Sequence, residues 1–194
     1  MKFLAAFLFV ASATLSYAQE KKNYYGIWSF HERNSNIYGL SVGLWTGPAP
    51  RQTTTNGIRL EAVGAGIILP MGLGTDPVAH NDTLFAQHQK NTISETVNGM
   101  NLSASGTVCH CTINGVNMGL ISHLVYKVNG FSAAIILNYT QVHRGIQVSF
   151  SNGTYIMRGM QIGIMNSSRK SKGVQIGIWN VNEKRKWPII NWNF

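Results

Sequence analysis

The stretch GVQIGIWN, residues 173–180, decides the fold, because related copies of it precede it along the chain. Each copy begins with glycine, continues with alternating apolar and polar residues, and follows the previous copy after 14 to 16 residues. Repetition at such a short, regular spacing is typical of architectures built from stacked units. The copies are GMNLSASG from Gly99, GVNMGLIS from Gly115, GFSAAIILN from Gly130, GIQVSFSN from Gly145 and GMQIGIMN from Gly159.

The alternation inside each copy predicts a short β-strand with two different faces. In the unit from Gly159, Ile162 and its apolar neighbours point one way, and Gln161 points the other way. We expect the apolar side to be buried, with Ile162 in the core and Gln161 facing water. One unit cannot bury its own apolar face, so neighbouring units must stack on one another.

A β-solenoid with one coil per unit is the fold that the turns favour. In a solenoid, equivalent residues of successive coils stack into ladders, whereas an antiparallel meander places successive turns at opposite ends of its strands. The turns NYTQVHRG, NGTYIMRG and NSSRKSKG resemble one another, which favours the solenoid. We therefore expect Asn138, Asn152, Asn166 and Asn180 to form a ladder whose amides bond backbone groups of the turns.

An antiparallel outer-membrane β-barrel is the alternative. Its apolar strand face would contact lipid, and its polar face would line the interior. The terminal Phe194, with Trp192 and Ile190 at alternating positions, resembles an outer-membrane assembly signal. However, the alternation covers only about seven residues per unit, and a spanning strand needs about 9–11.

The chain of 194 residues has 44% hydrophobic and 12% charged residues, which predicts one domain with a core. Residues 1–18 have the basic start, short apolar run and small-residue end of a signal peptide. We therefore expect export to the periplasm, the outer membrane or the cell surface. Residues 19–194 then form a single repeat-built β domain, divided into looser repeats (24–69), a long polar excursion (71–98), clear repeats (99–186) and a degenerate terminal unit (187–194).

The units GVQIGIWN and GMQIGIMN, in a chain that closes with PIINWNF, resemble those of short surface-repeat proteins of Gram-negative bacteria. Those proteins carry tandem units of the form Gly-x-Gln-apolar-Gly-apolar-x-Asn. Gln175, Gly177 and Asn180 match that form here, whereas the Gly115 unit has Asn117 in place of glutamine. The resemblance implies secretion or surface display, and it supplies no reaction and no catalytic residues.

The formal net charge of +9 predicts attraction to an anionic partner. We consider glycan, lipopolysaccharide, another envelope protein or a membrane, and disfavour nucleic acid. Basic residues recur in successive turns, so stacked repeats would gather them into a strip beside the aromatic Trp179. The strip residues are Arg158, Arg169, Lys170, Lys172, Lys184, Arg185 and Lys186. In the excursion, Thr83 follows Asp82 and is a candidate O-glycosylation site.

No catalytic or cofactor motif occurs in the sequence, which predicts a non-enzymatic protein without a cofactor. Cys109 and Cys111 share one strand face, and His110 points to the other, so three ligands cannot converge on one metal ion. A disulfide between them, a pair of free thiols or an intermolecular bridge is the expected state of these cysteines. His80, Asp82 and His88 are interpreted as part of a solvated loop rather than as a metal or acid–base cluster.

Overall fold

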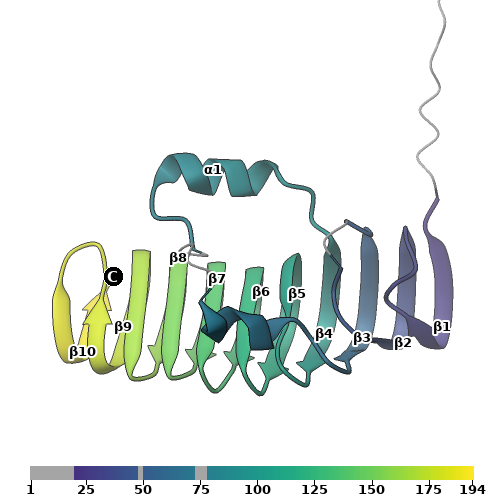
Figure 1. The fold of residues 1–194 in the computed structure, drawn as a ribbon. Coiled ribbons are helices and arrows are strands. Elements are labelled where there is room, and N and C mark those ends of the chain that lie inside the picture. Colours follow the sequence, from purple (N-terminus) through teal and green to yellow (C-terminus); the bar gives the residue numbers. More distant parts are fainter. Residues whose placement is uncertain (1–19, 48–49, 73–77) are drawn as a thin grey trace, which may run out of the picture.

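The computed structural model describes residues 20–47, 50–72 and 78–194. Its strands follow one another in chain order across a single sheet, with one excursion that carries an α-helix above them (Figure 1). The predicted signal peptide lies outside the described residues. The elements are β1 (Lys22–Ser29), β2 (Ser35–Gly43), β3 (Thr53–Glu61), the 3-10 helix η1 (Gly66–Met71), α1 (Asp82–Lys90), β4 (Glu95–Ser103), β5 (Val108–Gly119), β6 (Ser122–Ala133), β7 (Leu137–Val148), β8 (Ser151–Ile162), β9 (Met165–Val181) and β10 (Lys186–Asn193).

The strands form a β-solenoid, as the uniform turns predict. Each strand from β1 to β8 pairs in parallel with the next one, and equivalent residues of neighbouring coils lie in register. The sheet is open, with β1 and β10 at its two ends. The barrel alternative is therefore wrong, because a barrel of that kind needs antiparallel neighbours and a closed sheet. The terminal unit is also not a further coil, since β10 folds back antiparallel onto β9.

A glycine bends every coil at the same place. Gly159 has φ +128°, and a Cβ atom added there would lie 2.1 Å from the carbonyl oxygen of Gly145 in the preceding coil. Both the backbone conformation and the close approach of the next coil therefore require glycine. This explains why the repeat is marked by glycine in the sequence.

The expected assignment of the two strand faces is wrong. Gln161 is completely buried, whereas Ile162 keeps 37% of its surface exposed. Inside the coils, the Gln175 amide donates to Gln161 Oε1 (2.8 Å), and the Gln161 amide donates to Gln147 Oε1 (2.9 Å). The Gln175 amide also reaches a backbone carbonyl oxygen on the other side of its coil, that of Val181 (3.0 Å). The glutamine ladder thus satisfies buried backbone groups that apolar side chains would leave without partners.

The asparagine ladder is confirmed from Asn152 to Asn180, whereas Asn138 is in register with Asn152 but its side chain bonds Ser132 and the Val148 carbonyl oxygen instead. Asn152 Nδ2 donates to Asn166 Oδ1, and Asn166 Nδ2 donates to Asn180 Oδ1, both at 2.8 Å. The same Nδ2 groups donate to the carbonyl oxygens of Ile162 and Ile176, both at 2.9 Å. Like the glutamines, these amides join the coils to one another and close the bends of each coil.

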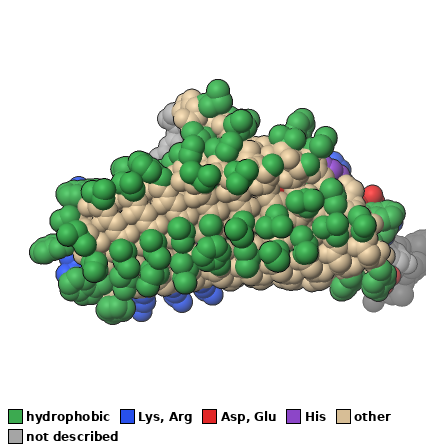
Figure 2. All heavy atoms as spheres, turned by 90° about the horizontal axis from the view of Figure 1, so that it is seen from below, with side chains coloured by type: hydrophobic (Ala, Val, Ile, Leu, Met, Phe, Trp, Pro, Cys, Tyr) green, Lys and Arg blue, Asp and Glu red, His purple; other side chains and the backbone are tan. Residues whose placement is uncertain are grey.

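The outward side of the segment after each bend is apolar in β2 to β9 and the turns that follow them. We call the set of positions one, three and five after each bend glycine the apolar face; Figure 2 shows it from below as ranks of hydrophobic side chains. Every one of these side chains is at least partly exposed. The residues are Leu40, Val42, Leu44, Ile58, Leu60, Ala62, Met100, Leu102, Ala104, Val116, Met118, Leu120, Phe131, Ala133, Ile135, Ile146, Val148, Phe150, Met160, Ile162, Ile164, Val174, Ile176 and Ile178.

The excursion runs from the end of β3 to the start of β4. It therefore begins before the predicted range 71–98 and also ends before the end of that range. It contains η1 and also α1, a helix that the polar sequence did not predict. The Asn81 side chain caps α1 by accepting from the Leu84 N–H at 2.8 Å. Phe85 of α1 stacks on the ring of Tyr155 in β8, with ring centroids 4.3 Å apart, which holds the helix against the coils.

Candidate binding site

A groove of about 530 Å³ crosses the coils of β7, β8 and β9. The groove is hollowed at its centre because Gly153 and Ser167, which are in register there, have no side chain and a small side chain, respectively. Tyr139, in register with Gly153, forms one end, and its ring lies against that glycine. Trp179, 48% exposed, lines the other end. Three strand spacings separate the first and last coils that line the groove, so it is roughly 14 Å long.

Arg169 supplies the only side-chain charge among the residues that line this groove. It sits where β9 bends and loses its pairing with β8, between the paired positions Ser168 and Lys170. Its side chain is exposed and forms no ion pair within the described part of the chain. The groove therefore combines two aromatic side chains, small hydroxyl-bearing residues and one free guanidinium.

The structure separates the predicted basic strip into several places. Arg158 and Lys172 stack in register with Arg144, each directly before a bend glycine, and form a basic column beside the apolar face. Lys170 instead lies on the α1 side, where its Nζ is 2.5 Å from Asp82 Oδ1. That contact and a hydrogen bond from the Tyr155 hydroxyl lower the pKa of Asp82.

The remaining strip residues, Lys184, Arg185 and Lys186, lie in the connection between β9 and β10 and at the start of β10. Arg185 donates to the Trp192 carbonyl oxygen (2.6 Å) and lies 4.5 Å from the centre of the Trp192 ring. This part of the predicted strip therefore closes the end of the solenoid and does not line the groove.

The candidate residues of the excursion do not form a cluster. Asp82 pairs with Lys170, and no interaction is present between Asp82 and either His80 or His88. Thr83 is exposed on the first turn of α1. Among residues 20–47, 50–72 and 78–194, no group of three or more His, Cys, Asp or Glu side chains is arranged to hold a metal ion.

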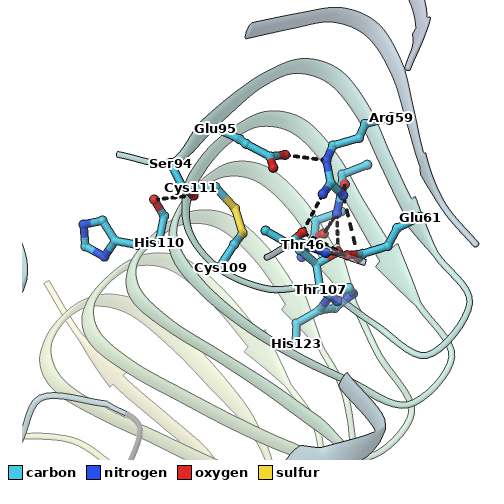
Figure 3. The surroundings of a disulfide bond; sticks show 12 residues. Thr46, Arg59, Glu61, Ser94, Glu95, Thr107, Cys109, His110, Cys111 and His123 are labelled. Atoms are coloured by element: carbon cyan, nitrogen blue, oxygen red, sulfur yellow. Dashed lines mark hydrogen bonds and ion pairs between the residues drawn. A yellow bond between two sulfur atoms is a disulfide. The ribbon is translucent and has the colours of Figure 1, made fainter. Parts of the chain in front are cut away.

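Cys109 and Cys111 form a disulfide within β5 (Figure 3). The pairing of β5 with β6 shifts register between Cys109 and Thr112, so the strand bends at this place. His110, between the cysteines, has its pKa lowered by burial and by the nearby His88. Of the states expected for the cysteines, the structure contains the disulfide between them.

A buried ionic cluster in the first coils was missed by the sequence interpretation (Figure 3). Arg59, only 1% exposed, donates to Glu95 (2.8 Å), Thr46 (2.5 Å) and Asn101 (2.8 Å), and its Nη1 lies 3.7 Å from Glu61. Burial raises the pKa of Glu95, and the Arg59 guanidinium opposes that rise. The sequence did contain a signal for a polar interior. The second residue after every bend glycine from Gly39 onwards is polar, and Arg59 and Asn101 are two of these residues.

His123 lies beside this cluster in a defined neutral form. Its Nδ1 accepts a hydrogen bond from the Thr107 backbone N–H (3.0 Å), and its Nε2–H donates to the Ala133 carbonyl oxygen (3.2 Å). Burial lowers the pKa of His123 to about 4. The imidazole therefore acts as a neutral link between coils and not as a charge.

Comparisons with known protein families, with curated proteins and with solved structures find no match to the chain. Within the described residues, none of the helices has the length and apolar character needed to cross a membrane. The groove and the apolar face are consequently interpreted from their own geometry and chemistry.

Proposed function

We propose that the protein is an exported, non-enzymatic surface-repeat protein that binds an acidic glycan in the groove between Tyr139 and Trp179. The observation that carries this proposal is the free Arg169 guanidinium between the two aromatic side chains. Export rests on the signal-like start of the sequence, and membership of the surface-repeat proteins rests on the repeat motif. The groove chemistry supplies the class of ligand.

Each part of the groove matches one property of an acidic saccharide. Sugar rings present apolar C–H faces that pack on aromatic side chains, and a tryptophan or tyrosine loses little conformational freedom on binding. The guanidinium of Arg169 can bond a carboxylate through two parallel N–H groups. Hydroxyls of residues such as Ser167 can exchange hydrogen bonds with those of the sugar.

The lining also favours binding over turnover. Apart from Arg169, the titratable side chain in the groove is the phenol of Tyr139. Hydrolysis of a glycosidic bond commonly uses a pair of carboxyl groups on either side of that bond, and no carboxyl group lines this groove. The side chains can therefore retain a saccharide but contain no acid–base pair to cleave it.

Calorimetric titration with oligogalacturonate, and with its neutral methyl ester as the matched ligand, tests the proposal. We expect the acid form to bind and the ester to bind about tenfold more weakly, since it cannot pair with Arg169. Arg169→Gln should remove most of the difference in affinity between the acid and the ester. Trp179→Ala should weaken the binding of both ligands. Arg158→Gln, on the basic column, is the charge-matched control and should bind normally. Binding unchanged in both groove variants, or no binding of any acidic glycan, contradicts the proposal.

A further inference from the structure

The apolar face is exposed along the solenoid. It consists of residues that follow each bend glycine, whereas the groove is lined mainly by residues that precede the bend glycines. The face extends across eight strands, which lie about 4.8 Å apart, and along three outward positions on each strand. These dimensions give it an area of about 500 Å². An apolar patch of this size is among the larger ones that a monomer exposes, and such patches often mark a functional surface. At its C-terminal end, Ile146, Met160, Val174, Lys172 and the exposed Phe194 line a shallow hollow of about 670 Å³.

A basic column follows one rim of this face. Arg144, Arg158 and Lys172 are in register on adjacent strands, directly before the first rank of apolar residues. Figure 2 shows Lys and Arg side chains along this rim. Like charges stacked on neighbouring strands repel one another, and none of the three forms an ion pair within the described chain. The column therefore costs stability in the isolated protein.

The fold does not require positive charge at this position. In earlier coils the same column holds Asn98, Asn114 and Asn129, whose side chains bond one another in series at 2.8 and 2.7 Å. This neutral ladder joins the coils without repulsion. Its replacement by Arg144 and the two cations that follow is explained by an anionic partner that lies against the same rim.

The described acidic residues provide no counter-charge there. Glu61 and Glu95 are buried in the ionic cluster, Asp82 is on α1, and Glu183 bonds Ser171. Glu20 and Glu32 lie before β1 and between β1 and β2, at the opposite end of the sheet from the basic column. A second copy of the chain placed on the apolar face would add cations without supplying acids. An anionic lipid layer supplies both an apolar interior for the face and negative headgroups for its rim.

We propose that the apolar face lies on the surface of an anionic lipid bilayer. The apolar ranks enter the boundary between acyl chains and headgroups, as the apolar side of an interfacial helix does. Arg144, Arg158 and Lys172 extend from the rim to the headgroup phosphates. Phe194 and the hollow beside it accommodate acyl-chain methylenes. Docking uses a different set of residues from the groove, so this proposal does not depend on glycan binding.

Flotation of the purified protein with vesicles tests the proposal. We expect binding to phosphatidylcholine vesicles containing one quarter phosphatidylglycerol, and weak binding to pure phosphatidylcholine. Each cation near an anionic surface contributes about a fivefold change in partitioning, so R144Q/R158Q/K172Q should bind about a hundredfold more weakly. Ile162→Glu, which places a charge in the middle of the face, should abolish binding.

A control with equal charge separates docking from simple electrostatic attraction. Lys22→Gln, Arg33→Gln and Lys90→Gln together remove three exposed cations from other surfaces and should change partitioning by less than about threefold. Circular dichroism of each variant establishes that the fold is retained. Equal losses in the two triple variants would overturn the proposal. So would a dimer in solution that Ile162→Glu dissociates, without vesicle binding, because the occupant of the face would then be a second copy.

Discussion

Changing Gln161 to Glu provides the sharpest test of the polar interior. The substitution keeps the size of the side chain and replaces its amide donor with an oxygen. The Gln161 amide donates to Gln147 Oε1 (2.9 Å), Thr154 Oγ1 (3.1 Å) and the Ser167 carbonyl oxygen (3.3 Å). After the change, three acceptors face a buried carboxylate, and the Gln175 amide keeps an acceptor oxygen as its partner.

The expected loss of stability follows from these contacts. Each lost hydrogen bond contributes about 1 kcal/mol, and burial of an unpaired carboxylate adds several kcal/mol unless it becomes protonated. We therefore expect Gln161→Glu to lower the free energy of unfolding by at least about 4 kcal/mol, a large part of a typical domain's 5–15 kcal/mol. The matched variant Ile162→Glu changes a partly exposed side chain on the same strand and should cost about 1 kcal/mol or less.

Urea denaturation followed by circular dichroism measures both losses, and pH adds a second readout. Burial raises the pKa of the introduced carboxyl above the value of about 4.3 in the unfolded chain. Stability of Gln161→Glu should therefore be restored as pH falls towards 4 and lost as pH rises through the folded-state pKa. Equal losses in the two variants, or a larger loss for Ile162→Glu, would refute the placement of Gln161 inside and Ile162 outside.

Three further predictions follow from other parts of the structure. Gly159→Ala should cost more than about 3 kcal/mol in urea denaturation, because its Cβ meets a carbonyl oxygen, whereas Gly72→Ala, with open space around it, should cost about 1 kcal/mol. Burial lowers the pKa values of both His123 and His143 from about 6.5 to about 4 on folding, so each imidazole should cost the wild type roughly 3 kcal/mol as pH drops through this window, and His123→Gln should keep only the His143 part of that loss. Replacing Cys109 and Cys111 by serine together should cost no more than about 2 kcal/mol, because the disulfide closes a very short loop.

The sequence was sufficient to predict the stacking of the coils. The repeated turns set the register, and Asn152 and Asn166 occupy the ladder positions that this register assigns to them. The groove could be foreseen only in part. Trp179 and Arg169 were candidates, but Tyr139 was missed, although the repeat spacing places it beside Gly153, because the sequence does not show that its ring packs over that glycine at the end of a groove.

The sequence could not show which strand face is inside. A period of two residues separates two faces but gives no direction, and burial of the apolar face was assumed because isolated polar groups are costly to bury. That cost does not apply to Gln161, since its amide has partners in the coils before and after it. The prediction failed because hydrogen bonds between identical side chains appear only when the coils are stacked, and a single repeat cannot reveal them.

The inverted faces also explain how the protein can have an exposed apolar face and a rigid frame together. The hydrogen-bond ladders of Gln161, Asn166 and their equivalents hold the coils from within, so the outward residues are not needed to form the core. β-branched residues such as Ile162 and Ile176 still suit the strand conformation. Uncharged polar β-formers such as threonine would suit it as well, yet every outward position of the apolar face from β2 to β9 is apolar. Strand formation alone does not explain that uniformity. The proposed contact with a lipid layer would account for it, and the cations that replace the asparagine column occur at the rim where such contact would place the headgroups.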